Sequence, residues 1–375
     1  MTVRDEVLGG ADELAVVAAA HADASESGRR LAAPVVDALV ATGLGRLCLP
    51  VEYGGPGIDP ATLVEAIERV SIADGAAGWC TMIAATTTSM AAFLEPAAAA
   101  DVFGDPNAIA GGVFAPNGQG VADGDGFRVT GRWPWGSGTQ HSRWILGGTR
   151  CDDDTFRLCF FEHDDVLFHD TWFTSGLRGS GSLDFSVDGV HVPAARTLQP
   201  GVTRPFVTSR LAVFPNFALL AAGVAAVGLG LARRSLDELV ALAGGKRPQF
   251  SSRTLAQNPY TQIELSRTEA GLRSARAFLL DELGRAWSVA DAGQRLAMED
   301  RFVIRMASVH AVRAAVDAVD AAYTLAGGSS VYSSNVLQRC LRDVHVTTQH
   351  LMVAPKLDET IGRFLLGQDV DPSTI

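Results

Sequence analysis

The chain has 375 residues, of which 47% are hydrophobic and 19% charged, and its formal net charge at pH 7 is -11. This composition excludes a disordered chain, and an acidic balance with no clustered stripe of Lys and Arg argues against a nucleic-acid partner. The sequence has five cysteines and no C-x-x-C pair. They therefore support neither a disulfide framework nor a metal site, and we expect reduced thiols in a cytoplasmic protein.

Residues 1–108 are predicted to form a helical domain. The N-terminus carries acidic residues where a signal peptide needs basic ones, so we interpret it as a first helix. The segment LAAPVVDALVATGLGRL spaces its apolar residues three and four apart and predicts a second. Another helix is expected to begin near Pro60, with Asp59 as its N-cap. The segment AAGWCTMIAATTTSMAAFL is apolar on nearly all sides, which is typical of a buried helix.

Residues 109–207 are predicted to form a small β domain. In FRVTGRWPW the alternation of side chains places Trp133 and Trp135 on one face and Arg132 on the other. The preceding DGDG is a turn signal. Further strands are predicted in RWILGGT, FRLCFFEH, VLFHDTW and LDFSVDGVHV.

Residues 208–375 are predicted to form a helical bundle, because helical periodicity returns and lasts to about residue 367. The uncharged segment FALLAAGVAAVGLGLA, residues 217–232, is shorter than a typical membrane span and consists mostly of Ala and Gly. We expect it to be a buried helix and expect no membrane contact. The order of helices, strands and helices defines an α+β fold that is mainly α.

Motifs for several common activities are absent from the sequence. No G-x-G-x-x-G follows a predicted strand, and neither G-x-x-x-x-G-K-[ST] nor G-x-S-x-G occurs. The chain therefore has no nicotinamide fingerprint, phosphate loop or hydrolase elbow of its own.

Several longer segments occur in an order that resembles the acyl-CoA dehydrogenase superfamily over nearly the whole chain. They are GDGFRVTGRWPWGSGTQHSRW, GLRGSGSLDFSVDGVHVP, KRPQFSSRTLAQNPYTQ, LAGGSSVY and LQRCLRDVHVTTQH. The resemblance implies an N-terminal helical domain, a central small β-barrel or sandwich and a C-terminal four-helix bundle. Within the superfamily the chain looks closest to the flavin-dependent monooxygenase branch, whose two-component members use reduced flavin and dioxygen.

The missing catalytic carboxylate is the reason for preferring that branch. The dehydrogenases carry a Glu about nine residues after an Arg-Asp pair, and here the pair is Arg342 and Asp343, but the window holds Gln349, His350 and Leu351. An alternative position of the base, in the segment FPNFALLAAG, also has no acid. A general base must lie within hydrogen-bond reach of the proton it removes, so these losses argue against dehydrogenation of an acyl-CoA.

The resemblance assigns flavin contacts to the loop WPWGSG. It implies that Trp135 covers the flavin ring, that Gly136 lies beside it, and that Ser137 donates a hydrogen bond toward flavin N5 or the peroxide. Ordinary core packing remains the alternative for the tryptophans, and a simple turn is the alternative for Ser137.

A second set of flavin contacts is implied in the bundle. Arg247, Phe250 and Gln262 match a family stretch that reaches the flavin of a neighbouring subunit, although Ser251 replaces a glycine and the spacing to the glutamine is longer. This departure leaves both FMN and FAD open as the cofactor. The paired glycines near the phosphate correspond to Gly327 and Gly328, for which a helix-ending turn is the alternative.

Two histidines near the C-terminus have different predicted roles. Five residues along one helix turn through about 140°, so His345 and His350 leave different faces and do not form a metal pair. The resemblance places a histidine near the former glutamate position, so we assign His350 to the site as a catalytic group and His345 to another face. The role of His350 would be to polarise a phenol, an indole or an amine, or to hold the distal oxygen of the flavin peroxide. A structural histidine is the alternative, and His141 is a second candidate.

The leading hypothesis is a homotetrameric flavin monooxygenase that takes reduced FMN or FAD from a separate reductase and oxygenates a small, aromatic organic substrate. The tetramer is expected because the Ala- and Gly-rich helix and the bundle loops would otherwise expose apolar surface. The alternatives are an acyl-CoA dehydrogenase-type oxidoreductase with a displaced base and a non-catalytic flavin-binding homologue.

Overall fold

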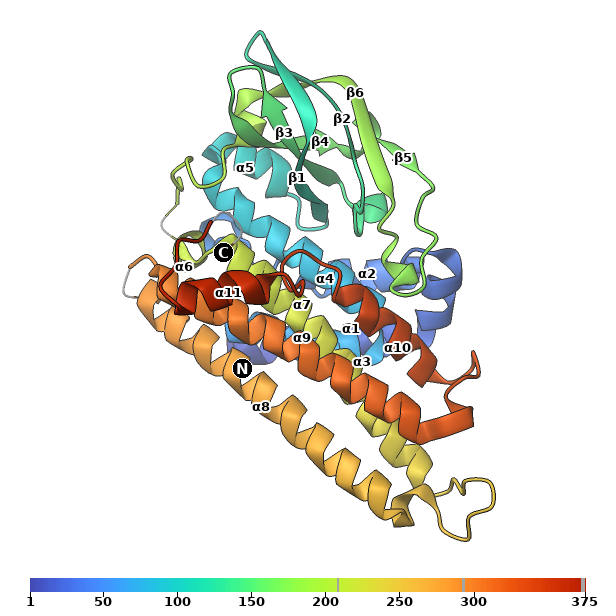
Figure 1. Cartoon of the computed structure of the whole chain (residues 1–375). Helices are drawn as coiled ribbons and strands as arrows, with labels where there is room; N and C mark the ends of the chain where they lie inside the picture. Colours follow the sequence, from blue (N-terminus) through green and yellow to red (C-terminus); the bar gives the residue numbers. More distant parts are fainter. Residues whose placement is uncertain (208, 292–293, 372–374) are drawn as a thin grey trace. The chain divides into compact units, whose positions relative to one another are not determined.

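The computed structural model describes residues 1–207, 209–291, 294–371 and 375. Helices precede and follow a set of strands (Figure 1), which confirms the α+β, mainly α fold. The chain forms two compact units. The first contains Met1–Ile58, Trp79–Thr174 and Arg178–Asn216, and the second contains Asp59–Gly78, Ser175–Leu177 and Phe217–Ile375. The division into three domains at residues 108 and 207 stays a prediction.

The first unit begins with helices whose ends follow local sequence signals. Thr2 caps the first helix, and its hydroxyl accepts a hydrogen bond from the Asp5 N–H while the Asp5 carboxylate accepts one from the Thr2 N–H. The helices of this unit are α1 (Val3–Gly28), α2 (Ala33–Ala41), α4 (Gly75–Thr87, from Trp79 onward), α5 (Pro96–Phe103) and α6 (Arg210–Val213).

The strands of the first unit form one seven-stranded sheet. They are β1 (Ala110–Asp123), β2 (Gly126–Trp133), β3 (Trp144–Cys151), β4 (Phe156–Glu162), β5 (Leu167–His169), β6 (Asp184–Pro193) and β7 (Thr197–Leu198). Their order is β5-β6-β2-β1-β3-β4-β7, and β1 and β3 are parallel while the other pairs are antiparallel.

Alternation along the strands separates two cores on the two faces of this sheet. Trp144 and Leu146 pack with buried residues of α5, whereas Ile145 points to the opposite core. In that second core the Trp133 ring stacks on Phe185 of β6 at 5.2 Å and lies 5.5 Å from Phe161 of β4. Because β4 and β6 are not neighbours in the sheet, the sheet must curl around this core, as a small barrel or sandwich does.

The second unit is helical. The predicted start of one helix at Pro60 is confirmed, because the Asp59 carboxylate accepts a hydrogen bond from the Thr62 N–H at 2.9 Å. The long helices α8 and α9 run side by side (Figure 1). The helices of this unit are α3 (Pro60–Ala73), α7 (Asn216–Ala243), α8 (Pro259–Asp291), α9 (Met298–Ala326), α10 (Val336–Thr347) and α11 (Leu357–Leu365).

Small residues let α7 pack closely against its neighbours. A Cβ atom on Gly230 would lie 2.5 Å from the Ser71 Cβ and 2.6 Å from the Glu68 carbonyl oxygen, so α3 approaches the α7 backbone directly. Within the described residues, α7 alone is long and apolar enough to cross a membrane, and 83% of its most apolar stretch is buried inside the protein. A core helix has the same properties.

Candidate functional site

Four buried side chains of the first unit form a hydroxyl cluster, consisting of Trp79, Ser137, Ser180 and Ser182. The Trp79 indole Nε1 of α4 donates to the Ser137 Oγ at 2.9 Å. The Ser137 Oγ lies 2.6 Å from the Ser182 Oγ, which lies 2.7 Å from the Ser180 Oγ. Indole N–H groups only donate, so Ser137 accepts from Trp79 and can donate its own proton to Ser182 or to another acceptor.

Backbone hydrogen bonds fix the loop that carries Ser137. The Gly136 N–H donates to the Leu183 carbonyl at 2.8 Å, and the Gly138 N–H donates to the Ser180 carbonyl at 3.2 Å. Gly138 has φ 69°, a left-handed conformation that favours glycine. The glycines around Ser137 therefore serve a tight turn that presses its hydroxyl against the segment before β6.

The prediction that Trp133 and Trp135 lie on the same face of one strand is wrong. Strand β2 ends at Trp133, because Pro134 has no N–H to donate to a sheet ladder. Trp135 adopts φ 65°, and its side chain is 69% exposed. A non-glycine residue in this conformation is uncommon, and such residues concentrate at functional sites. The exposed indole is available to cover a ring, but that role stays a prediction.

His141 lies beside the same loop. Its Nε2 atom is buried and has no hydrogen-bond partner among the described residues. Burial lowers the pKa of His141 to about 4, so the ring is neutral at physiological pH. A buried nitrogen without a partner is costly unless a ligand satisfies it, which keeps His141 as a second site candidate.

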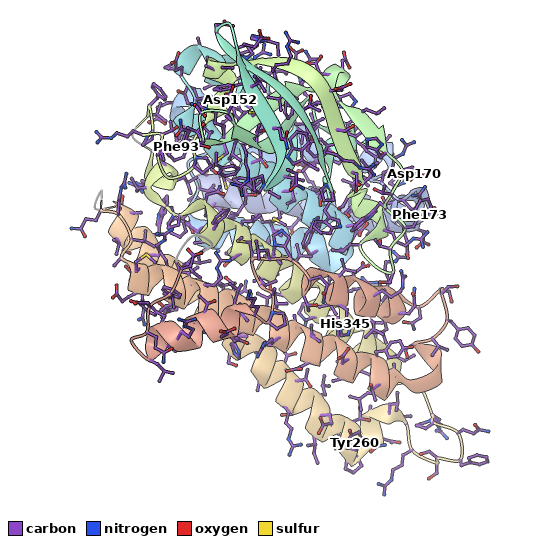
Figure 2. The ribbon with its side chains drawn as sticks, turned by 45° about the horizontal axis from the view of Figure 1, so that its top comes forward. Phe93, Asp152, Asp170, Phe173, Tyr260 and His345 are labelled. Carbon is purple, nitrogen blue, oxygen red and sulfur yellow. The ribbon has the colours of Figure 1, made fainter. Side chains whose placement is uncertain are left out.

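His345 and His350 do not share a helix, contrary to the prediction. Helix α10 ends at Thr347, and the His350 N–H donates to the Thr347 carbonyl at 3.2 Å in the turn that follows. The angle of about 140° expected for two residues five apart on one helix therefore does not apply to this pair. His345 is exposed on α10 (Figure 2), and its Nε2 lies 3.0 Å from the Asp320 Oδ1. The two rings still have separate environments.

The turn around His350 is held from two sides; we call Arg305, His350 and Met352 the histidine turn. The Met352 N–H donates to the His350 Nδ1 at 3.3 Å. The Arg305 Nη1 donates to the Met352 carbonyl at 2.9 Å, and Arg305 is only 1% exposed. The His350 side chain keeps partial access to solvent, yet burial and, secondly, the positive charge of Arg305 lower the pKa of His350 to about 4.

The Arg-Asp pair of the sequence motif has a structural role in this unit. The Arg342 Nη1 donates to the Ser175 carbonyl at 2.6 Å, and the Asp343 Oδ1 accepts from the Leu177 N–H at 2.6 Å. Asp343 is buried, and Leu177 has φ 47°. The pair therefore anchors the short segment Ser175–Leu177 onto α10.

The predicted flavin contacts of the bundle lie in loops and at helix ends. Arg247 and Phe250 are exposed between α7 and α8, and Phe250 is fully exposed with φ 63°. Gln262 is exposed at the start of α8, where its amide donates to the Ala256 carbonyl at 2.8 Å. The side chain of Tyr260 projects from the same end of α8 (Figure 2).

Gly327 and Gly328 follow the last residue of α9, and Gly327 has φ 55°. The Lys246 Nζ donates to the Ala326 carbonyl and, at 2.6 Å, to the Ser329 Oγ. This is a helix-ending turn closed by a cation, and contact with a phosphate stays a prediction. The sequence interpretation missed Lys246, Trp79, Ser182 and Arg305, because their partners are distant in the sequence.

Comparisons with known proteins agree with this fold. Residues 222–355 match the family described as "Acyl-CoA dehydrogenase, C-terminal domain". The indole-3-acetate monooxygenase of Pseudomonas putida is 33% identical over 354 residues, which cover 92% of this chain and 89% of that protein. The flavin-dependent monooxygenase, oxygenase subunit HsaA, of Rhodococcus jostii is 27% identical over 90% of this chain and 91% of that protein. The structure of XiaF from Streptomyces sp. in complex with FADH2 and glycerol superimposes with a TM-score of 0.92 at 25% identity, covering 98% of this chain and 96% of that chain.

The fold and these relatives define a flavin-dependent oxidoreductase of the acyl-CoA dehydrogenase superfamily. Within it, the chain belongs to the flavin-dependent monooxygenases. The resemblance expected from the sequence is thereby confirmed, and these relatives support neither the dehydrogenase nor the non-catalytic alternative.

The chain's own residues fit a flavin cofactor. Trp135 offers an exposed aromatic surface, Ser137 offers a hydroxyl proton that Trp79 cannot accept, and His141 offers a buried Nε2 without a partner among the described residues. A planar ring with several polar edge atoms needs this combination of a stacking surface and hydrogen-bonding groups.

Proposed function

We propose that this chain is the oxygenase component of a two-component system, which receives reduced FMN or FAD from a separate reductase and inserts one oxygen atom into a small aromatic substrate. The observation that carries the proposal is the segment 344–353, which offers the imidazole of His350 and no carboxylate. The relatives support it, since one is named for indole-3-acetate and another as an oxygenase subunit.

The proposal assigns catalytic roles to His350 and Ser137. A reduced flavin supplies the electrons that activate dioxygen. Trp135, Gly136 and Ser137 would hold its ring and exclude water from it, while His350 would hydrogen-bond the substrate. The XiaF structure contains FADH2, and structures of TdsC from Paenibacillus contain FMN, so the proposal keeps both flavins.

The remaining cofactor contacts are proposed for the bundle. Arg247, Phe250 and Gln262 would bind the flavin of a neighbouring subunit, and Gly327 and Gly328 would lie near its phosphate. Support comes from the exposure of the first three side chains at the end of the bundle where α8 begins.

We propose a homotetramer in the cytoplasm. Large apolar side chains are exposed on Phe250, Tyr260, Val331 and Tyr332 of the second unit, and burial between subunits would remove them from water. The five cysteines are buried and form no disulfide, which fits a reducing compartment.

The experiment combines the purified protein with a flavin reductase, reduced FAD or FMN, and a panel of phenols, indoles and arylacetates under labelled dioxygen. We expect tighter binding of reduced than of oxidised flavin, and a product that carries one labelled oxygen atom. Flavin that is bleached anaerobically by an acyl-CoA, with no oxygenated product from any aromatic, would overturn the proposal in favour of the dehydrogenase.

A further inference from the structure

Asn216, the first residue of α7, has an amide oxygen that is buried and has no hydrogen-bond partner among the described residues. The other end of the same amide is held, because its Nδ2 donates to the Ser89 Oγ at 2.8 Å. Both residues belong to the first unit. Buried carbonyl oxygens in folded proteins nearly always accept a hydrogen bond, so this atom marks a position where a donor is missing.

Ser89 determines which way the Asn216 amide points. The Ser89 hydroxyl donates its one proton to the Thr86 carbonyl at 2.7 Å. Its oxygen can therefore accept from the amide N–H but has no proton for the amide oxygen. Turning the amide over would place its oxygen against the Ser89 oxygen, acceptor against acceptor. The Asn216 Oδ1 is thus directed away from Ser89.

The hydroxyl groups beside Ser89 do not supply the missing donor either. Three buried threonines precede it, and each donates its proton to a backbone carbonyl three or four residues earlier. They are Thr86, Thr87 and Thr88, with donor–acceptor distances of 2.8, 2.7 and 2.7 Å. Next to Asn216 along the chain, Pro215 has no N–H and Phe214 is apolar and buried. We therefore expect the donor to belong to a bound molecule.

The distance of Asn216 from the flavin loop suits the far end of a substrate. Trp79 donates to Ser137 of that loop from α4, and Ser89 lies in the 3-10 helix Thr88–Phe93 that follows α4. The two positions are about ten residues apart, and such a stretch of helix is about 15 Å long. An amide at this distance cannot contact the reacting atoms, but it can contact the end of the substrate that points away from the flavin.

We propose that Asn216 is a specificity-determining residue, whose Oδ1 accepts a hydrogen bond from an uncharged N–H or O–H group at the remote end of the substrate. Ser89 is the positioning residue that holds the amide. The substrate class is an aromatic compound whose side chain ends in an amide or an alcohol. A carboxylate has no proton to donate and would meet the amide oxygen, acceptor against acceptor. The inference rests on the proposed function, because it assumes that an aromatic substrate lies beside the flavin loop.

The first test compares acids with their amides, which have nearly equal shape. Equilibrium dialysis at neutral pH measures the binding of phenylacetate, phenylacetamide, indole-3-acetate and indole-3-acetamide to protein loaded with oxidised flavin, so that no turnover occurs. We expect the wild type to bind each amide roughly 10-fold more tightly than its acid. Asn216→Leu removes the acceptor at similar volume and should bind amides and acids about equally.

Asn335→Leu is the matched control. Asn335 caps α10, and its side-chain oxygen already accepts a hydrogen bond from the Leu337 N–H at 2.8 Å. This variant should lose stability but keep the full preference for amides. Loss of the preference in both variants would assign the effect to general destabilisation and would overturn the proposal.

A second variant at the same position serves if Asn216→Leu does not fold. Asn216→Asp keeps the shape and an acceptor but adds a negative charge, so acids should bind more weakly than they bind to the wild type. Unchanged binding of the acids by this variant would show that position 216 does not face the ligand and would overturn the proposal.

Ser89→Ala tests the positioning role of Ser89. Without the hydroxyl the Asn216 amide can turn and present its N–H, so acids should bind more tightly than to the wild type while amides bind more weakly. A merely structural loss would weaken both kinds of ligand alike, and that result would overturn the role of Ser89.

The remaining outcomes separate this inference from the proposed function. Acids bound as tightly as amides by the wild type, or a preference that survives in Asn216→Leu, would overturn the inference alone. Oxygenation of another aromatic compound, with no binding of any of the four probes, would do the same. Flavin-loaded protein that neither binds nor oxygenates any aromatic compound would overturn the proposed function and the inference with it.

Discussion

The hydroxyl cluster of the first unit and the histidine turn of the second differ in whether the donor and acceptor of each hydrogen bond are fixed. In the cluster, Ser137, Ser182 and Ser180 can each donate or accept, so the direction of the chain of hydroxyls is reversible. In the histidine turn, one backbone N–H and one guanidinium dictate a single direction. The hydroxyls of the cluster can therefore take either direction, whereas the hydrogen bonds of the histidine turn have one.

The largest effect on product formation is expected for substitution of His350. His350→Ala should lower product formed per reduced flavin by about 10² to 10³, the usual cost of losing a preorganised donor. His345→Ala is the control, since His345 is exposed and paired with Asp320, and it should leave turnover nearly unchanged. Product and released peroxide are measured together. Equal behaviour of the two variants would make His350 structural and remove the contrast between the two regions.

Substitutions in the hydroxyl cluster should have smaller effects, which are measured as changes in stability and in flavin binding. Ser137→Ala leaves the buried Trp79 N–H without its acceptor at a cost of roughly 1–3 kcal/mol, and it should weaken flavin binding measured by fluorescence quenching. The single substitution Trp79→Phe removes the N–H donor itself, so no buried donor is left without an acceptor. Its loss of stability should be smaller than that of Ser137→Ala, while its flavin affinity should also fall.

Trp133→Phe is the matched control for this pair. The Trp133 Nε1 donates to the Gly148 carbonyl at 2.8 Å in the β core, so its loss should lower the melting temperature but leave flavin affinity intact. A control that weakens flavin binding as much as Trp79→Phe would assign the effect to general destabilisation.

Acid should destabilise the protein through two neutral histidines, His141 beside the Ser137 loop and His350 in the histidine turn. The pKa values of His141 and His350 are lowered to about 4, so the unfolded chain, with an ordinary histidine pKa of 6.5, takes up protons at higher pH than the folded chain. Stability is therefore fully present above about pH 6.5 and falls as the pH decreases toward 4, by up to a few kcal/mol for each group.

Urea denaturation from pH 7.5 to 4.5 tests this directly. His141→Phe should match or exceed the wild type at pH 7.5, since it removes a buried nitrogen without a partner among the described residues, and should lose less stability in acid. Parallel pH profiles for the two proteins would contradict the neutral, buried state of His141.

The smallest change in activity is expected for Asp343 of the Arg-Asp pair, because its contacts hold a segment in place. Asp343→Ala removes the acceptor of the Leu177 N–H and should cost about 1.5–3 kcal/mol of stability, typical of a hydrogen bond to a charged group. Product yield per reduced flavin should stay near the wild-type value in the folded fraction. A selective loss of yield at unchanged stability would bring Asp343 into the site.

Features that depend on neighbours along the chain can be predicted from the sequence. Asp59 and Pro60 start a helix because an N-cap and a first-turn proline act locally, and the strands follow a two-residue alternation that burial requires. The order of helices and strands and the missing carboxylate near His350 were likewise readable, and they led to the family.

The contacts that give those residues their chemistry form only in the folded chain. Trp79 meets Ser137 across 58 residues, and Arg305 meets Met352 across 47, distances at which no periodicity carries information. Trp135 lies outside β2, which ends before Pro134, and His350 lies in the turn after α10, which ends at Thr347. Residue type can therefore be read from the chain, but the direction of a proton depends on which atoms folding brings within 3 Å or so of each other.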